Sequence, residues 1–123
     1  MSAPMKHGAI SFWRRGVVPK GKEYILEIGD QVIREYVEDF GGPEEISTGQ
    51  AILFHNLKRM LIVEMLASED LARTGIVDKK GNISPVLGTF YIAILNGIAR
   101  HVDKLGLKRT RGTETWTRYL ASR

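Results

Sequence analysis

The chain lacks the residues on which several classes of protein depend. None of its 123 residues is cysteine, which excludes a disulfide framework, a thiolate nucleophile and a cysteine-bound zinc. Long hydrophobic runs are also missing, and the apolar stretch Met60 to Val63 is bounded by Arg59 and Glu64. We therefore expect no membrane-spanning segment. The N-terminus has no continuous apolar region of the kind a signal peptide needs, so we expect no signal peptide. The lack of cysteine fits the reducing cytoplasm, where we expect the protein to be located.

Motifs for catalysis and cofactor binding are missing as well. The three histidines, His7, His55 and His101, never occur in His-Glu-x-x-His or Glu-x-x-His spacing, so we expect no metal. Neither a P-loop nor a Gly-x-Gly-x-x-Gly sequence is present, which leaves nucleotide binding without support. The acidic pairs, such as Glu44-Glu45, fall near predicted helix ends and have a structural explanation there. We expect a protein that is not an enzyme and that binds no cofactor.

Charge is sorted by position along the chain. Residues 1–22 carry five basic side chains and no acidic one. Residues 101–123 carry six basic side chains against Asp103 and Glu114, whereas residues 23–100 hold seven basic and twelve acidic residues. The three segments have net charges of +5, +4 and −5, within a total of +4. Basic chain ends around an acidic middle are typical of arms that meet a polyanion, although solvated tails would show the same pattern.

Residues 1–22 predict an irregular arm, because they contain two prolines and three glycines. Phe12 and Trp13 precede Arg14 and Arg15, which puts planar groups next to guanidiniums. This combination suits phosphate contact together with base stacking or wedge insertion. The alternative is that Phe12 and Trp13 simply cover the core.

Three helices are predicted after the arm. Apolar residues recur at intervals of three and four from about Gly21 to Phe40, and Gly41-Gly42-Pro43 ends this first helix. The second runs from Ser47 to about Arg73, because Ser47 and Gln50 have the spacing of a capping box and Gly75 follows. The third begins at Ser84-Pro85 and is closed by Gly106.

The second and third helices are predicted to form the core of the fold. Apolar residues between Ile52 and Leu71 cover more than one stripe of the second helix, which is typical of a central helix or of one shared with another subunit. Because the neighbouring helices leave part of this surface bare, we expect a homo-oligomer. The short connection at residues 74–83 predicts that the last two helices form a long antiparallel hairpin. Gly88 and Gly97 lie within the third helix, where a glycine either allows close helix approach or occupies an unoptimised surface position.

The sequence therefore predicts an all-α fold of three helices with a basic N-terminal arm and a short C-terminal tail. The domains are the arm at 1–22, a helical domain at 23–107 and a basic tail at 108–123. In the tail, Trp116, Tyr119 and Leu120 have helical spacing, and we expect them to dock on the body or on a neighbouring subunit.

The stretch from about Gly21 to Arg111 resembles a family of phage proteins. It begins where a basic segment ends in Val18-Pro19-Lys20-Gly21-Lys22, continues with Ile46-Ser47-Thr48-Gly49-Gln50 after a glycine-bounded helix, and closes with Leu105-Gly106-Leu107-Lys108-Arg109. This order is similar to that of small terminase subunits, the DNA-recognition partners of viral packaging motors. The resemblance implies helical hairpins assembled as rings, flanking basic segments that engage DNA, a terminase large subunit as partner, and the cytoplasm of a bacterial host. Many small terminases carry a helix-turn-helix before the hairpin, and this chain shows none.

We therefore predict a non-catalytic, oligomeric protein that binds duplex DNA with little sequence preference. Its nucleic-acid contacts fall in two basic segments, at Arg14, Arg15, Lys20 and Lys22, and at Lys108, Arg109 and Arg111. The alternative is a protein-interaction or assembly module of a phage or mobile element with no specific nucleic-acid role. A small regulator of a toxin–antitoxin or plasmid-maintenance system is a third hypothesis.

Overall fold

The structure is a computed structural model that describes residues 8–75, 77, 80–82, 90–107 and 114–122. Within these ranges the chain is all-α and contains no strand. Its elements are α1 (Gly8–Arg15), α2 (Glu23–Asp39), the 3₁₀ turn η2 (Pro43–Glu45), α3 (Thr48–Thr74), α4 (Ile92–Leu105) and α5 (Glu114–Ala121). The all-α prediction is confirmed. The predicted count of three helices is wrong, because α1 and α5 form in the segments expected to be an arm and a tail.

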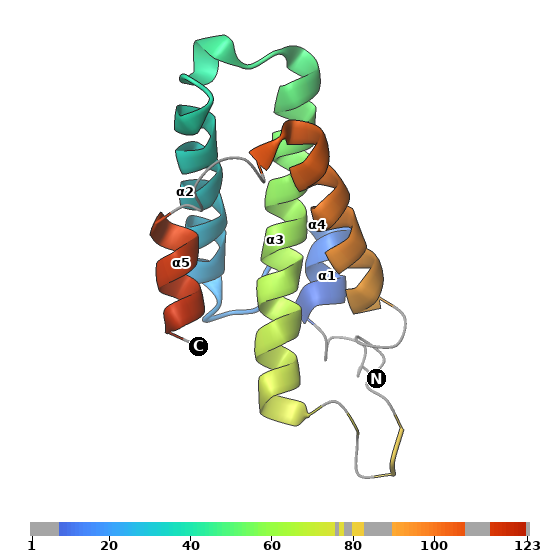
Figure 1. The fold of residues 1–123 in the computed structure, drawn as a ribbon. Coiled ribbons are helices and arrows are strands. Elements are labelled where there is room, and N and C mark those ends of the chain that lie inside the picture. Colours follow the sequence, from blue (N-terminus) through green and yellow to red (C-terminus); the bar gives the residue numbers. More distant parts are fainter. Residues whose placement is uncertain (1–7, 76, 78–79, 83–89, 108–113, 123) are drawn as a thin grey trace.

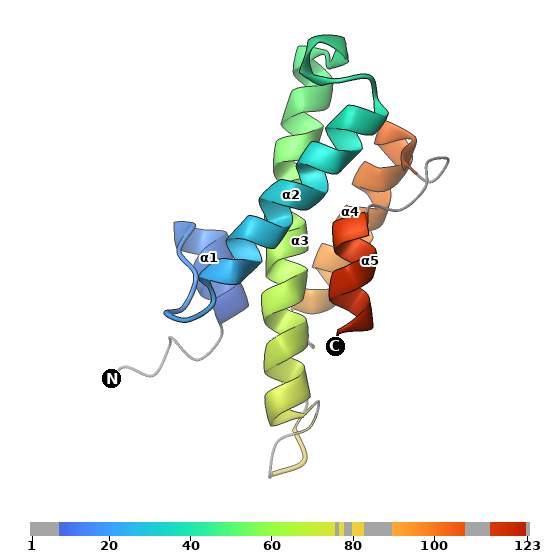
Figure 2. The same cartoon turned by 90° about the vertical axis from the view of Figure 1, so that its left-hand side faces the viewer.

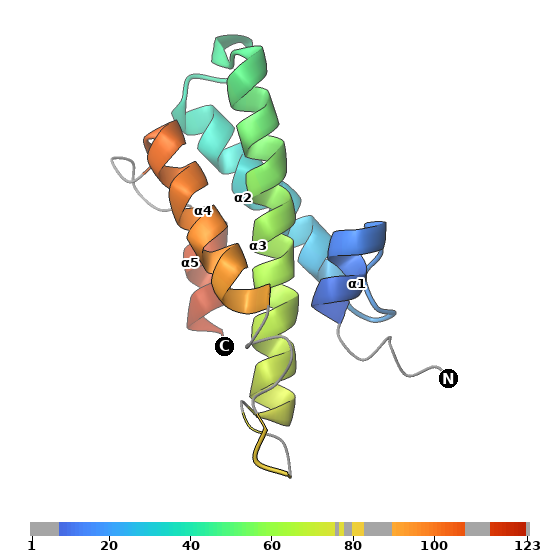
Figure 3. The same ribbon diagram turned by 90° about the vertical axis from the view of Figure 1, so that its right-hand side faces the viewer.

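The central element is α3, against which α1, α2 and α4 pack, while α5 packs against α2 (Figure 1). Two views at right angles to the first place α1 and α5 on opposite sides of α3 (Figures 2 and 3). Every residue of α3 from Met60 to Ala67 is buried. The apolar surface from which we expected an oligomer is thus covered over this stretch within a single chain.

The ends of α3 follow the sequence prediction. Ser47 Oγ accepts a hydrogen bond from the Gln50 backbone N–H (3.1 Å), and Gln50 Oε1 accepts one from the Ser47 N–H (2.9 Å). This reciprocal pair confirms the predicted capping box. At the other end Gly75 adopts a φ of +86° and its N–H returns to the Leu71 carbonyl.

Helix α4 lies beside α3 and runs antiparallel to it, as the hairpin prediction required (Figure 1). It ends at Gly106, which is left-handed with a φ of +76°. Gly97 permits close approach, because a Cβ there would lie 2.7 Å from Met60 Sδ on α3. The predicted helix start at Ser84-Pro85 and the glycine at position 88 lie outside the described residues.

Helix α1 corrects the prediction of an irregular arm. Ala9 and Phe12 are three residues apart and both are buried in the core with Leu66 and Met65 of α3. A helix of eight residues is too short to be stable alone, so docking against α3 supplies what local propensity lacks. It ends at Gly16, whose φ is +74° and whose N–H donates to the Phe12 carbonyl.

Helix α5 confirms that Trp116 and Tyr119 of the tail cluster dock on the body, whereas Leu120, the third residue of the predicted cluster, is 44 % exposed. Trp116 and Tyr119 pack with the core, and Tyr119 is 8 % exposed. The Glu35 carboxylate of α2 accepts hydrogen bonds from the Thr115 backbone N–H (3.1 Å) and hydroxyl (2.6 Å). An acid beside a helix N-terminus satisfies free N–H groups and complements the helix dipole. No helix in the described ranges is both long enough and apolar enough to cross a bilayer.

Candidate nucleic-acid interface

Arg14, Arg15 and Lys20 are exposed cations of α1 and of the linker that follows it, and together we call them the basic patch. The two arginines end α1, and Lys20 lies on the linker between α1 and α2. Within the described part of the chain, none of the three side chains has a hydrogen bond or an ion pair. Other lysines and arginines are paired with acids, as in Lys58–Asp30 (3.1 Å) and Arg118–Glu114 (2.7 Å). Among the described residues, no acidic side chain compensates the charge of the basic patch.

The backbone that carries the patch is held to α3 by Arg59. The Arg59 Nη2 donates to the Trp13 carbonyl (2.9 Å), and the guanidinium lies 4.5 Å from the centroid of the Trp13 ring. A cation at the last carbonyls of a helix satisfies them and complements the dipole, and its position over the indole face adds a cation–π attraction. The edge of Phe90 contacts the same indole at 6.3 Å between centroids. Trp13 is 36 % exposed, so it covers part of the core and still offers a surface to solvent.

Lys22, the fourth predicted contact of the N-terminal segment, is engaged within the chain. Its Nζ lies 2.6 Å from Glu69 Oε1 and 5.9 Å from the centroid of the Tyr24 ring. The hydrogen bond to Glu69 raises the pKa of the Lys22 ammonium. Because this charge is already compensated, we leave Lys22 out of the basic patch.

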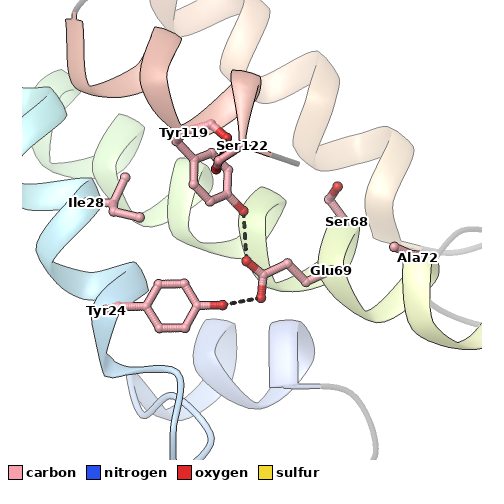
Figure 4. Close-up of a pocket in the computed structure, with 7 residues that line it drawn as sticks. All are labelled: Tyr24, Ile28, Ser68, Glu69, Ala72, Tyr119 and Ser122. Atoms are coloured by element: carbon pink, nitrogen blue, oxygen red, sulfur yellow. Dashed lines mark hydrogen bonds between the residues drawn. The ribbon is translucent and has the colours of Figure 1, made fainter.

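Glu69 itself is a junction between three helices, which we call the Glu69 junction (Figure 4). Besides Lys22, it accepts hydrogen bonds from the Tyr24 hydroxyl of α2 (2.5 Å) and the Tyr119 hydroxyl of α5 (3.0 Å). Burial raises the pKa of the Glu69 carboxyl, but the donors from Lys22, Tyr24 and Tyr119 outweigh burial and hold the pKa below its ordinary value. For Tyr24, burial and the bond to Glu69 both raise the pKa of the phenol.

A pocket of about 630 Å³ opens beside this junction. Ile28, Ala72 and the two tyrosine rings supply apolar walls, and Ser68 and Ser122 also line the pocket (Figure 4). A carboxylate has about four lone-pair positions, and donors of the chain already use three of those on Glu69. The carboxylate in the pocket therefore serves mainly to join α2, α3 and α5.

A second hollow, the α2–α3 groove, lies between the end of α2 and the start of α3. Its volume is about 360 Å³. The residues lining it are Ile33, Val37, Pro43, Ile46, Ala51, Phe54, His55 and Lys58. The exposed acids Glu38, Asp39, Glu44 and Glu45 are each within two positions of a lining residue, and we call them the acidic rim. No described residue forms an ion pair with any of the four.

The three predicted nucleic-acid contacts of the C-terminal segment cannot be placed relative to the basic patch. Lys108, Arg109 and Arg111 lie outside the described residues, and the second basic segment stays a prediction. In the ranges that the structure covers, no group of three or more histidine, aspartate or glutamate side chains is placed to hold a metal ion. Sequence analysis missed the Glu69 junction, because its three donors are 45 to 50 positions away from Glu69 and no local spacing connects them to it.

Comparison of the chain with models of protein families, with curated proteins and with solved structures finds no match.

Proposed function

We propose that the chain is a non-catalytic protein that binds duplex DNA through the basic patch of α1 and its linker. The observation that carries the proposal is that Arg14, Arg15 and Lys20 are exposed and lack an acidic partner within the described residues. Cations of this kind release counterions when they neutralise phosphates, and this term supplies most of non-specific DNA affinity. The resemblance to small terminase subunits, and the terminase large subunit as a partner, remain predictions.

The docking of α1 supports this role because it fixes the cations before they meet DNA. Phe12 is buried, and the Trp13 carbonyl is bound by Arg59, so the last turn of α1 is tied to the central helix. Groups that are already ordered lose less conformational entropy on binding. The half-exposed indole of Trp13 lies next to the two arginines in sequence and can add an apolar or stacking contact.

Fluorescence anisotropy with a labelled duplex of random sequence tests the proposal. Three phosphate contacts predict a slope of about −2.7 in a plot of log affinity against log salt, so affinity should fall about 40-fold for a fourfold rise in salt. The variant Arg14→Ala/Arg15→Ala should retain about one contact and lose only about 3-fold to 4-fold over the same range.

Arg100→Ala/Lys104→Ala is the matched control. Both residues are exposed on α4 and, like the basic patch, have no ion pair with a described residue. The control removes the same charge and should leave the salt slope unchanged. A parent protein that does not bind at low salt, or equal slopes for the two double variants, would show that the patch is an ordinary solvated surface.

A further inference from the structure

The surface charge of the molecule is divided between two regions near opposite ends of α2. Residues 23–45 hold eight of the fourteen acidic residues and a single basic one, Arg34. Four of these acids form the acidic rim at the end of α2 and in η2, whereas the basic patch lies just before α2 begins. Each region is uncompensated by the described residues of its own chain.

Both regions also combine charge with apolar surface. Next to the basic patch, Val17 is 61 % exposed and Trp13 is 36 % exposed. Next to the acidic rim, the walls of the α2–α3 groove are formed largely by apolar side chains such as Val37, Ile46 and Phe54. Charged groups around an apolar contact are the usual anatomy of a protein interface, in which apolar burial supplies affinity and charge supplies orientation.

One copy of the chain cannot bring the two regions together. Helix α2 has 17 residues, which is about 25 Å at 1.5 Å per residue, and it separates the linker of the patch from the groove. Figure 1 shows α1 near the start of α2, with η2 at the far end. The patch of one molecule can meet the groove only on another molecule.

We propose that the basic patch of one copy docks at the α2–α3 groove of a second copy, and that this contact and duplex DNA exclude each other. The exclusion rests on the proposed function, because it needs the same three cations to contact phosphates. To the basic patch, the four carboxylates of the rim present the same charge as a short run of phosphates. The contact is heterologous, with different surfaces on the two partners. At high protein concentration, self-association therefore occupies the cations that DNA needs.

Charge-reversal variants of the basic patch and of the acidic rim distinguish this contact from non-specific association. Arg14→Glu/Arg15→Glu gives the patch a net negative charge, and Glu44→Lys/Glu45→Lys cancels the net charge of the rim, because Glu38 and Asp39 remain. In either variant alone the patch and the rim no longer have opposite net charges, whereas an equimolar mixture again contains an unchanged basic patch and an unchanged acidic rim. All four positions are exposed, so circular dichroism should show an unchanged helical fold. Arg100→Glu/Lys104→Glu, on α4, carries the same charge change as the patch variant and serves as the control.

Sedimentation equilibrium at low salt is the first measurement. The parent and the control should show a mass that rises above 13.8 kDa with concentration and returns to that value as salt is added. Each reversed variant should remain at 13.8 kDa, and their mixture should associate. A parent that stays monomeric up to millimolar concentration, or a mixture that does not associate, would overturn the docking.

Energy transfer between donor-labelled and acceptor-labelled copies is the second measurement. Unlabelled duplex DNA should abolish the energy transfer between copies of the parent protein. The DNA concentration that removes half of the transfer should be close to the dissociation constant for DNA. If DNA binds and the transfer persists, the exclusion is wrong although docking stands. If the charge-swapped mixture associates but the parent binds no DNA, the proposed function fails and the self-association remains.

Discussion

Replacing Glu69 by alanine should lower the free energy of unfolding by about 2 kcal/mol, because three helices lose a shared acceptor. In the parent, the carboxylate receives donors from Lys22, Tyr24 and Tyr119. Alanine leaves none of these donors an acceptor at this position. The fold should remain the same, since Glu69 is not part of the apolar core.

The three donors contribute unequally because their exposure differs. Tyr119 is 8 % exposed, and a buried hydroxyl that loses an acceptor costs about 1–3 kcal/mol. The Lys22–Glu69 pair is partly solvated, so its loss costs at most about 1 kcal/mol. Tyr24 is 42 % exposed, and water can replace its partner. The total is about 1–4 kcal/mol, and for a chain of 123 residues a loss of 2 kcal/mol lowers the Tm by about 8 °C.

Urea unfolding followed by circular dichroism measures this effect, with Glu27→Ala as the control. Glu27 is an exposed acid of α2 that has no hydrogen bond or ion pair with a described residue, so its removal should change stability by less than about 0.5 kcal/mol. If Glu69→Ala and Glu27→Ala unfold at the same urea concentration, the junction contributes nothing and our reasoning about it is wrong.

The same site predicts a pH dependence with a definite sign. The pKa of the Glu69 carboxyl is lower in the folded chain than in the unfolded chain, where it is about 4.3. Its stabilisation is therefore complete above that pH and is lost as the pH falls through the lower, folded-state pKa. The stability difference between the parent and Glu69→Gln should be constant from neutral pH down to about pH 5 and should narrow in more acidic solution. A difference that widens on acidification would contradict the assigned direction.

Three further substitutions test the fold. Ser47→Ala should destabilise by about 1 kcal/mol in thermal unfolding, because it removes the side-chain acceptor of the α3 capping box, and an unchanged Tm would contradict the cap. Leu61→Asp should prevent folding or cost several kcal/mol because Leu61 is 6 % exposed, whereas Ile52→Asp on the same helix should be nearly silent because Ile52 is 58 % exposed. Gly97→Val should destabilise by about 2 kcal/mol, since its side chain would overlap Met60, and a gain in Tm would show that α3 and α4 are less closely packed than described.

The features that the sequence predicted well are those encoded by neighbouring residues. Ser47 and Gln50 are three positions apart, and Gly106 follows directly on the helix that it ends, so both signals could be recognised without knowing the tertiary structure. The apolar character of α3 was also evident from the sequence, but the sequence did not show which segments cover its apolar surface. The sequence indicated excess apolar surface, and only the structure shows that α1, α2 and α4 cover the segment from Met60 to Ala67.

The features that escaped prediction depend on contacts between distant parts of the chain. Helix α1 is short and rich in basic residues, and it is stabilised by burying Ala9 and Phe12 against α3. Lys22 lies in a basic segment and was predicted to contact phosphate, yet the carboxylate of Glu69, 47 positions away, compensates its charge. Arg14, Arg15 and Lys20 gave the same sequence signal as Lys22. Only the tertiary structure distinguishes a cation that is used internally from one that remains available.

The Glu69 junction connects the start of α2 with α5, the last described helix of the chain. A single carboxylate on α3 binds Lys22 and Tyr24, at the start of α2, and Tyr119, near the end of α5. Segments that share such an anchor tend to open as one cooperative unit in native-state hydrogen exchange. Proteolytic removal of α5 should therefore accelerate amide exchange in the first turn of α2, although the two segments are almost a hundred residues apart in sequence.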